Sequence, residues 1–217
     1  MKAYKLVIFD WDGTVMDSVP KIVSCLQNAA VSLNLTVPDI CQAKNVIGLS
    51  LSKAVAQLFP QQADLHFAII DEYKRQYREL DQTPTPLFEN VETVLQHLTA
   101  KGFILAVATG KGRDGLERLL DESGLRQYFA VTRCSDDAES KPSPQMLQQI
   151  LSYCQLSSAD AVMIGDSQLD MAMAEAINMP RIGVSFGAHT KQQLAVYKPE
   201  IIVDCYTELA AHLLEGK

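Results

Sequence analysis

The chain has 217 residues, of which 47% are hydrophobic and 21% are charged, a balance typical of folded globular proteins that argues against wholesale disorder. Acidic residues outnumber basic ones by 26 to 19, so the formal net charge is -7 at pH 7. We find no basic stripe and no apolar run near about 18 residues, which excludes nucleic-acid and membrane partners. Five scattered cysteines without a CxxC spacing favour reduced thiols in a cytoplasmic protein.

The first predicted element is a strand at residues 5–9, a continuous apolar run. Only helical patterns follow it, from residue 18 to residue 82, and two prolines, Pro84 and Pro86, then favour a stiff extended connector. This arrangement predicts an all-α cap domain at 18–82, inserted into a core domain formed by 1–17 and 83–217.

Beyond the connector, apolar runs of strand length alternate with helical patterns. One helix is predicted from the spacing of Val91, Val94, Leu95 and Leu98. The remaining strands are expected at 103–108, 129–132, 161–164, 181–184 and 201–203. Runs without alternation indicate strands buried on both faces, so we predict an α/β fold with a doubly wound, Rossmann-like parallel sheet.

Three polar clusters directly follow predicted strands. In an open parallel sheet, ligands bind outside the carboxyl ends of the strands, so clusters distant in sequence should meet in one crevice. The clusters contain Asp10 and Asp12 after the first strand, Thr109, Gly110 and Lys111 after the second, and Asp166 and Asp170 after the strand at 161–164.

The four aspartates of these clusters predict a metal site. Carboxylates that close raise one another's pKa values, and a hard divalent cation such as Mg²⁺ relieves the repulsion. We therefore expect Asp10, Asp12, Asp166 and Asp170 around Mg²⁺. A bend after the first strand, which Gly13 permits, could instead let Asp12 offer its backbone carbonyl and keep its carboxyl for proton transfer.

Positive and neutral donors complete the expected site. Lys141 precedes a predicted helix N-terminus, where a compact positive charge suits a phosphate. The Thr109 hydroxyl and the Gly110 amide could donate to a phosphoryl oxygen. A carboxylate nucleophile, a metal, a lysine and a hydroxyl together form a phosphoryl-transfer site.

Two other functions stay open at this point. Residues 110–115 match the GxGxxG pattern after a strand, with Asp136 further on, as in a dinucleotide-dependent oxidoreductase. That alternative leaves the paired aspartates unexplained. The chain could also be a non-catalytic module that binds a phosphorylated ligand.

In order, the segments DWDGT, ATGK, SKPSP and GDSQLD resemble the motifs of the haloacid dehalogenase superfamily of phosphatases. The helical insert is similar to that of its subfamily with a C1-type cap, and the nearest members are phosphoglycolate-phosphatase-like. The resemblance implies a Mg²⁺-dependent hydrolase that forms an aspartyl-phosphate on a small phosphorylated metabolite. It names neither the physiological substrate nor the oligomeric state.

The resemblance also implies roles for single residues. Asp10 resembles the nucleophile, and Asp12 resembles the general acid that later becomes the base. Asp166 resembles a direct Mg²⁺ ligand and Asp170 a second acidic position near the metal. The groups that would hold or flank the transferring phosphoryl are Thr109, Gly110, Lys111 and Lys141.

The segment Gly48, Leu49 and Ser50 is similar to the cap segment that selects substrate in this family. Sugar phosphomutases of the family tend to carry an arginine near there, whereas this chain has Leu51. The resemblance therefore favours a hydrolase and keeps a mutase as the alternative.

Overall fold

The computed structural model describes residues 4–215. Its six strands form one parallel sheet in the order β3-β2-β1-β4-β5-β6, which places the first strand next to the centre. The strands are β1 (Leu6–Phe9), β2 (Ile104–Ala108), β3 (Val131–Arg133), β4 (Ala161–Gly165), β5 (Arg181–Val184) and β6 (Ile202–Val203). The predicted α/β fold with a parallel sheet is thus confirmed, and each predicted strand lies within two residues of an observed one.

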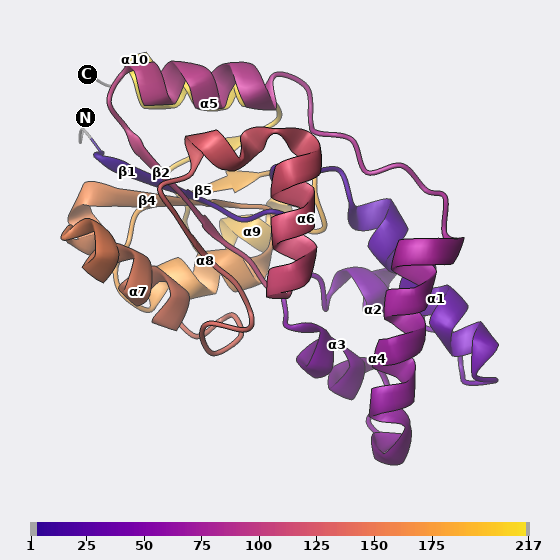
Figure 1. Cartoon of the computed structure of the whole chain (residues 1–217). Coiled ribbons are helices and arrows are strands. Elements are labelled where there is room, and N and C mark those ends of the chain that lie inside the picture. Colours follow the sequence, from indigo (N-terminus) through magenta and orange to yellow (C-terminus); the bar gives the residue numbers. More distant parts are fainter. Residues whose placement is uncertain (1–3, 216–217) are drawn as a thin grey trace.

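Helices cover both faces of this sheet (Figure 1). Alternate residues of β1 enter different cores. Val7 and Phe9 pack with α5 (Val91–Ala100), α6 (Arg113–Ser123) and α10 (Tyr206–Glu215), whereas Leu6 and Ile8 pack with α7 (Gln145–Cys154) and α8 (Gln168–Glu175). Because both faces are buried, the strand sequences are apolar throughout. The other helices of this part of the chain are η3 (Leu125–Tyr128), η4 (Ser158–Asp160) and α9 (Lys191–Ala195).

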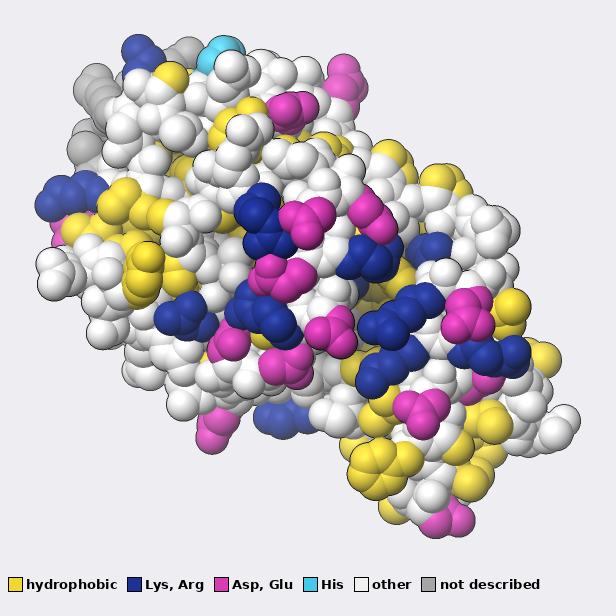
Figure 2. Space-filling view, viewed as in Figure 1, with side chains coloured by type: hydrophobic (Ala, Val, Ile, Leu, Met, Phe, Trp, Pro, Cys, Tyr) yellow, Lys and Arg dark blue, Asp and Glu magenta, His cyan; other side chains and the backbone are white. Residues whose placement is uncertain are grey.

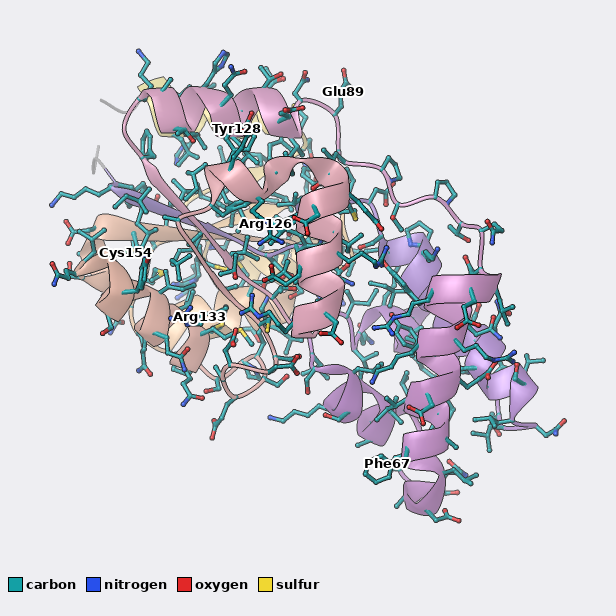
Figure 3. The ribbon with its side chains drawn as sticks, in the orientation of Figure 1. Phe67, Glu89, Arg126, Tyr128, Arg133 and Cys154 are labelled. Atoms are coloured by element: carbon teal, nitrogen blue, oxygen red, sulfur yellow. The ribbon has the colours of Figure 1, made fainter. Side chains whose placement is uncertain are left out.

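The segment between β1 and α5 forms a helical group beside the sheet layers, at the right of Figure 1. It contains α1 (Val19–Ser32), α2 (Ile40–Lys44), α3 (Leu51–Leu58), η1 (Ala63–Leu65), α4 (His66–Arg75) and η2 (Gln76–Leu80), the last a short π-helix. Two apolar clusters hold it together, one around Leu26 and Ile47 and the other around Val55 and Ile69. Phe67, which is 84% exposed, projects near the end of this group that lies away from the sheet (Figure 3).

The helical group also contacts the sheet side of the molecule. Ala188, from the loop after β5, belongs to the same apolar cluster as Val19 and Ile22 of α1. The chain leaves β1 through a tight loop in which the Trp11 carbonyl accepts hydrogen bonds from the amides of Thr14, Val15 and Met16. This loop carries the first polar cluster and joins it to the helical group.

Candidate active site

The carboxyl ends of β1, β2 and β4 lie side by side, because β1 pairs with β2 on one edge and with β4 on the other. Asp10, Thr109 and Asp166 are the first residues after these three strands. The chain winds outward from β1 to β3 and then returns to β4, so these residues stand at the switch point of the sheet. The structure therefore brings the three predicted clusters together.

Asp10 is buried at the centre of this arrangement. Its Oδ1 accepts a hydrogen bond from the Trp11 amide at 2.7 Å and lies 2.8 Å from Nζ of Lys141. Burial, and then repulsion by Asp170, raise the pKa of Asp10 well above its ordinary range, and Lys141 opposes this effect. The other oxygen, Oδ2, is buried without a hydrogen-bond partner among the described residues, which leaves a position for a ligand.

Asp166 is held by donors from two loops. Its Oδ1 accepts a hydrogen bond from the Thr14 hydroxyl at 2.9 Å, and its Oδ2 accepts one from the Ala188 amide at 2.7 Å. Burial, and then repulsion by Asp170, raise the pKa of Asp166 to about 7. Gly13 packs against this carboxylate with a φ of +79°, and a Cβ there would collide with it. Only glycine meets both conditions, so Gly13 lets the β1 loop close on Asp166.

Asp170 lies in the first turn of α8, where it forms a capping box with Ser167. Its Oδ2 accepts hydrogen bonds from the Ser167 amide at 3.1 Å and from the Ser167 hydroxyl at 2.6 Å. Its Oδ1 lies 2.6 Å from Nζ of Lys141. Helix capping therefore fixes the orientation of this carboxylate in the site.

Carboxylate oxygens of Asp10, Asp166 and Asp170 lie within 4.8 Å of one another. All three side chains are buried, and burial followed by repulsion from Asp170 raises the pKa values of Asp10 and Asp166 although Lys141 opposes the shift. Together with the unpartnered Oδ2 of Asp10, this donor set fits a hard divalent cation such as Mg²⁺. The Asp12 carboxylate is not part of this group.

Lys141 is completely buried, in contrast to a solvated lysine beside a helix end. Helix α7 begins at Gln145, and the Lys141 ammonium instead bridges Asp10 at 2.8 Å and Asp170 at 2.6 Å. Burial by itself would lower the pKa of Lys141, but attraction by Asp10 and then Asp170 raises it above its ordinary value. The lysine therefore stays charged and fixes the two carboxylates relative to each other.

Asp12 also belongs to the β1 loop and is 8% exposed. Its Oδ1 accepts a hydrogen bond from the Ser18 hydroxyl at 2.7 Å and lies 3.2 Å from Nζ of Lys111. Burial alone would lower the pKa of Lys111, but Asp12 raises it above its ordinary value. The same ammonium stands 4.9 Å from the ring centre of Tyr77, so it links the Asp12 loop to the helical group.

The loop after β2 supports the predicted donors. Thr109 is buried, and its Oγ1 accepts a hydrogen bond from the Lys111 amide at 3.2 Å. At Gly110 a Cβ would collide with the carbonyl oxygen of Gly48, because the helical group approaches this backbone directly. The Ser50 amide, close by in sequence, donates to the Ser140 hydroxyl at 2.8 Å.

A cavity of about 430 Å³ lies between the helical group and the carboxyl ends of the strands. Its walls include Asp10, Asp12, Thr109, Gly110 and Lys111 from the sheet side, and Gly48, Leu49 and Ser50 from the helical group. Asp166, Asp170 and Lys141 do not line it and lie beneath Asp10. The structure thus places every predicted site residue in the cavity or directly against Asp10.

The GxGxxG segment runs from β2 into α6, as a dinucleotide site would require. However, the Asp136 carboxylate accepts a hydrogen bond from the Arg113 amide at 2.6 Å, at the start of α6. In a dinucleotide site the negatively charged pyrophosphate would occupy this helix start. The contact therefore speaks against the oxidoreductase alternative.

Three contact residues were not anticipated from the sequence: Thr14, Ser18 and Tyr77. Thr14 and Ser18 follow Asp12 by a few residues, and only the folded β1 loop shows which carboxylate each one reaches. Tyr77 lies in a helical stripe of apolar residues, a pattern that indicates core packing. The polar hydroxyl of Tyr77 was the one feature of the sequence that could have indicated a role besides core packing.

A family model described as haloacid dehalogenase-like hydrolase matches residues 7–184. The chain is 37% identical to the probable phosphatase IndB of Dickeya dadantii (strain 3937), covering 96% of this chain and 94% of that protein. It is 29% identical to the phosphoglycolate phosphatase of Vibrio cholerae serotype O1, covering 94% of each chain. A solved structure of a predicted phosphatase from Clostridium acetobutylicum superposes with a TM-score of 0.87 at 26% identity, covering 98% of this chain and 99% of that one.

Proposed function

This chain belongs to the family of haloacid dehalogenase-like hydrolases, and we propose that it is a Mg²⁺-dependent phosphatase that hydrolyses small phosphomonoesters through an intermediate on Asp10. The relatives named as phosphatases support this class of reaction. The observation that carries the proposal is the unpartnered Oδ2 of Asp10, a buried carboxylate oxygen at the wall of the cavity.

In the proposed first step, an oxygen of Asp10 attacks the phosphorus, the bond between Asp10 and phosphate forms, and the ester P–O bond breaks. Asp12 gives its proton to the leaving alcohol oxygen. In the second step, Asp12 takes a proton from water while the water oxygen bonds to phosphorus. The bond to Asp10 then breaks, inorganic phosphate leaves, and both aspartates return to their starting states.

The other residues would bind and orient the phosphoryl group. The Thr109 hydroxyl, the Gly110 amide and the Lys141 ammonium would face its oxygens, and Lys111 would flank it. Lys141 already stands 2.8 Å from Asp10, so its positive charge lies where negative charge develops in the transition state.

We propose that Asp10, Asp166 and Asp170 hold the Mg²⁺ ion, with the backbone carbonyl of Asp12 as a further candidate ligand. Bound there, the cation would offset the carboxylate charges and stabilise the negative charge of the transferring phosphoryl group. The fit rests on the three buried carboxylates within 4.8 Å of one another.

Residues 18–82 would serve as the cap over this site. Gly48, Leu49 and Ser50 line the cavity opposite Asp10, where they could contact the leaving group of the substrate. A closed cap would exclude bulk water from the intermediate. None of the described helices is long and apolar enough to cross a membrane, and the cytoplasmic location stays a prediction.

Phosphate release from a panel of phosphorylated metabolites, with MgCl₂ present, tests the proposal. We expect hydrolysis of at least one ester, loss of activity in excess EDTA, and recovery when Mg²⁺ is restored. Full activity after complete chelation would contradict the metal's role. Absence of release from every ester, and from a chromogenic aryl phosphate, would contradict the phosphatase assignment.

A further inference from the structure

The cavity has a second basic region, which the proposed phosphoryl chemistry does not use. Lys74 in α4 and Arg78 in η2 line the cavity from the helical group, and Arg118 lines it from α6. We name these three residues the outer basic cluster. Figure 2 shows Lys and Arg side chains gathered where α4 faces the sheet side of the molecule. Two separate parts of the fold therefore direct positive charge toward one cavity.

The charges of this cluster are largely unpaired. Lys74 and Arg78 form no ion pair or side-chain hydrogen bond with any residue from 4 to 215. Arg118 pairs with Glu122 at 2.9 Å, an exposed contact within one helix that contributes little. By contrast, Lys111 is paired with Asp12 at 3.2 Å. The cluster is thus free to bind an anion.

The carboxylates that line the cavity do not cancel this charge. Asp10 contacts Lys141, Asp12 contacts Lys111, and Asp136 accepts from the Arg113 amide. Asp114, the fourth, is exposed in the first turn of α6. Three of the four are therefore already occupied by donors within the protein.

Tyr77 adds a neutral donor in the same wall. It lines the cavity, and its hydroxyl is buried without a hydrogen-bond partner within the part of the chain that the structure describes. An unpartnered buried hydroxyl is costly and points to a ligand that completes it. Nearby lining residues, including Ile22, Leu26 and Ile70, are apolar.

We infer that the leaving alcohol of the substrate carries a second anionic group, which the outer basic cluster and Tyr77 bind while its carbon skeleton lies against the apolar wall. This inference rests on the proposed phosphatase function and names its substrate class. A volume of about 430 Å³ lies within the range of cavities that hold medium-sized organic ligands. This volume favours a leaving group larger than a two-carbon acid. The second anionic group on that leaving group is a carboxylate or a second phosphate.

The test uses three aryl phosphates that share a skeleton: 4-carboxyphenyl phosphate, its neutral analogue 4-carbamoylphenyl phosphate, and 1,4-phenylene bisphosphate. We expect the wild-type protein to hydrolyse the carboxylate or the bisphosphate with about tenfold higher kcat/KM than the neutral ester. The better of the two charged esters identifies the second anion. The preference should appear mainly in KM, because the cluster lies away from the reacting atoms.

Substitutions that remove two charges of the outer basic cluster test whether this cluster causes the preference for charged esters. R78Q combined with R118Q should bring the ratio of kcat/KM for the charged ester to kcat/KM for the neutral ester close to one. The control is R75Q, which removes one arginine charge at the end of α4, next to η2, at a residue that pairs with Glu72 and does not line the cavity. This control should retain the wild-type ratio.

Calorimetry of ester binding to the D10N variant distinguishes failure of the proposed anion site from failure of the proposed phosphatase function. Equal kcat/KM for charged and neutral esters in the wild-type protein would overturn the inference and leave the phosphatase function standing. If no ester is hydrolysed, the phosphatase function fails, and the binding measurement decides the anion site by itself. Equal affinity of D10N for charged and neutral esters would then overturn the site, and tighter binding of a charged ester, lost in R78Q/R118Q, would support it.

Discussion

Replacing Lys141 by methionine removes a positive charge that lies between two buried carboxylates. Its ammonium stands 2.8 Å from Asp10 and 2.6 Å from Asp170. With an effective dielectric constant of about 20, each contact corresponds to an attraction of about 6 kcal/mol before desolvation is counted. Removing one partner of a buried ion pair costs about 3–5 kcal/mol net, because the remaining charge stays uncompensated.

We therefore expect K141M to lower the free energy of unfolding by about 3–5 kcal/mol, out of about 5–15 kcal/mol for a typical protein. Urea unfolding, followed by circular dichroism in metal-free buffer at pH 7, measures the change as a lower midpoint at similar slope. The double variant K141M/D170N should lose less than the two single losses combined, because it removes a carboxylate together with its cation.

A K141M protein within about 0.5 kcal/mol of the wild type would refute this reasoning, since surface substitutions have effects of that size. The lysine would then be a solvated side chain rather than the buried bridge between two acids. The control is K53M, which removes the charge of an exposed lysine in α3 and should leave the unfolding midpoint nearly unchanged.

Three further predictions concern packing, metal and thiols. G110A should destabilise the contact between the helical group and β2, because its Cβ would collide with the backbone of Gly48; we expect a loss of about 1–3 kcal/mol in urea unfolding, and an unchanged midpoint would contradict the close approach. Mg²⁺ should raise the melting temperature of the wild-type protein but not of D10N/D166N, and equal shifts in both would place the ion elsewhere. Burial raises the pKa of the Cys25 thiol to about 12, so a maleimide at pH 7.5 should modify the exposed Cys41 and Cys205 first; equally fast loss of Cys25 in peptide mass spectra would contradict its burial.

The sheet and the meeting of the three clusters could be predicted from the sequence because both follow from short-range pattern. Apolar runs such as the one at 161–164 are buried on both faces only in a covered parallel sheet. Residues that directly follow neighbouring parallel strands must then share one edge, which is why Asp10 and Asp166 lie close together.

The partners of single side chains could not be predicted, because they depend on how loops fold against one another. The sequence predicted Lys141 as a phosphate-binding lysine before a helix, but it did not predict the contacts of its ammonium with Asp10 and Asp170. For Asp12 the sequence left two arrangements open, with its carboxylate or its backbone carbonyl toward the metal, and the β1 loop turns the carboxylate toward Ser18 and Lys111. Spacing in sequence does not specify which donor each of these side chains reaches once the loops have folded.

The position of the helical group over the site could not be predicted from the sequence either. The helical patterns at 18–82 predicted helices but not the cavity wall to which Tyr77 belongs. The close approach of Gly48 to Gly110 depends on two backbones that are far apart in the chain. Such contacts arise from tertiary packing rather than from local propensity.

The central claim is that Asp10 attacks phosphorus, and kinetics of D10N tests it most directly. We expect turnover of a chromogenic aryl phosphate to fall by several orders of magnitude, because asparagine cannot form the acyl-phosphate. The fold should be retained, since Lys141 keeps its contact with Asp170 at 2.6 Å when Asp10 is replaced. A D10N protein that folds and retains wild-type turnover would contradict the account, because the reaction would then proceed without this carboxylate.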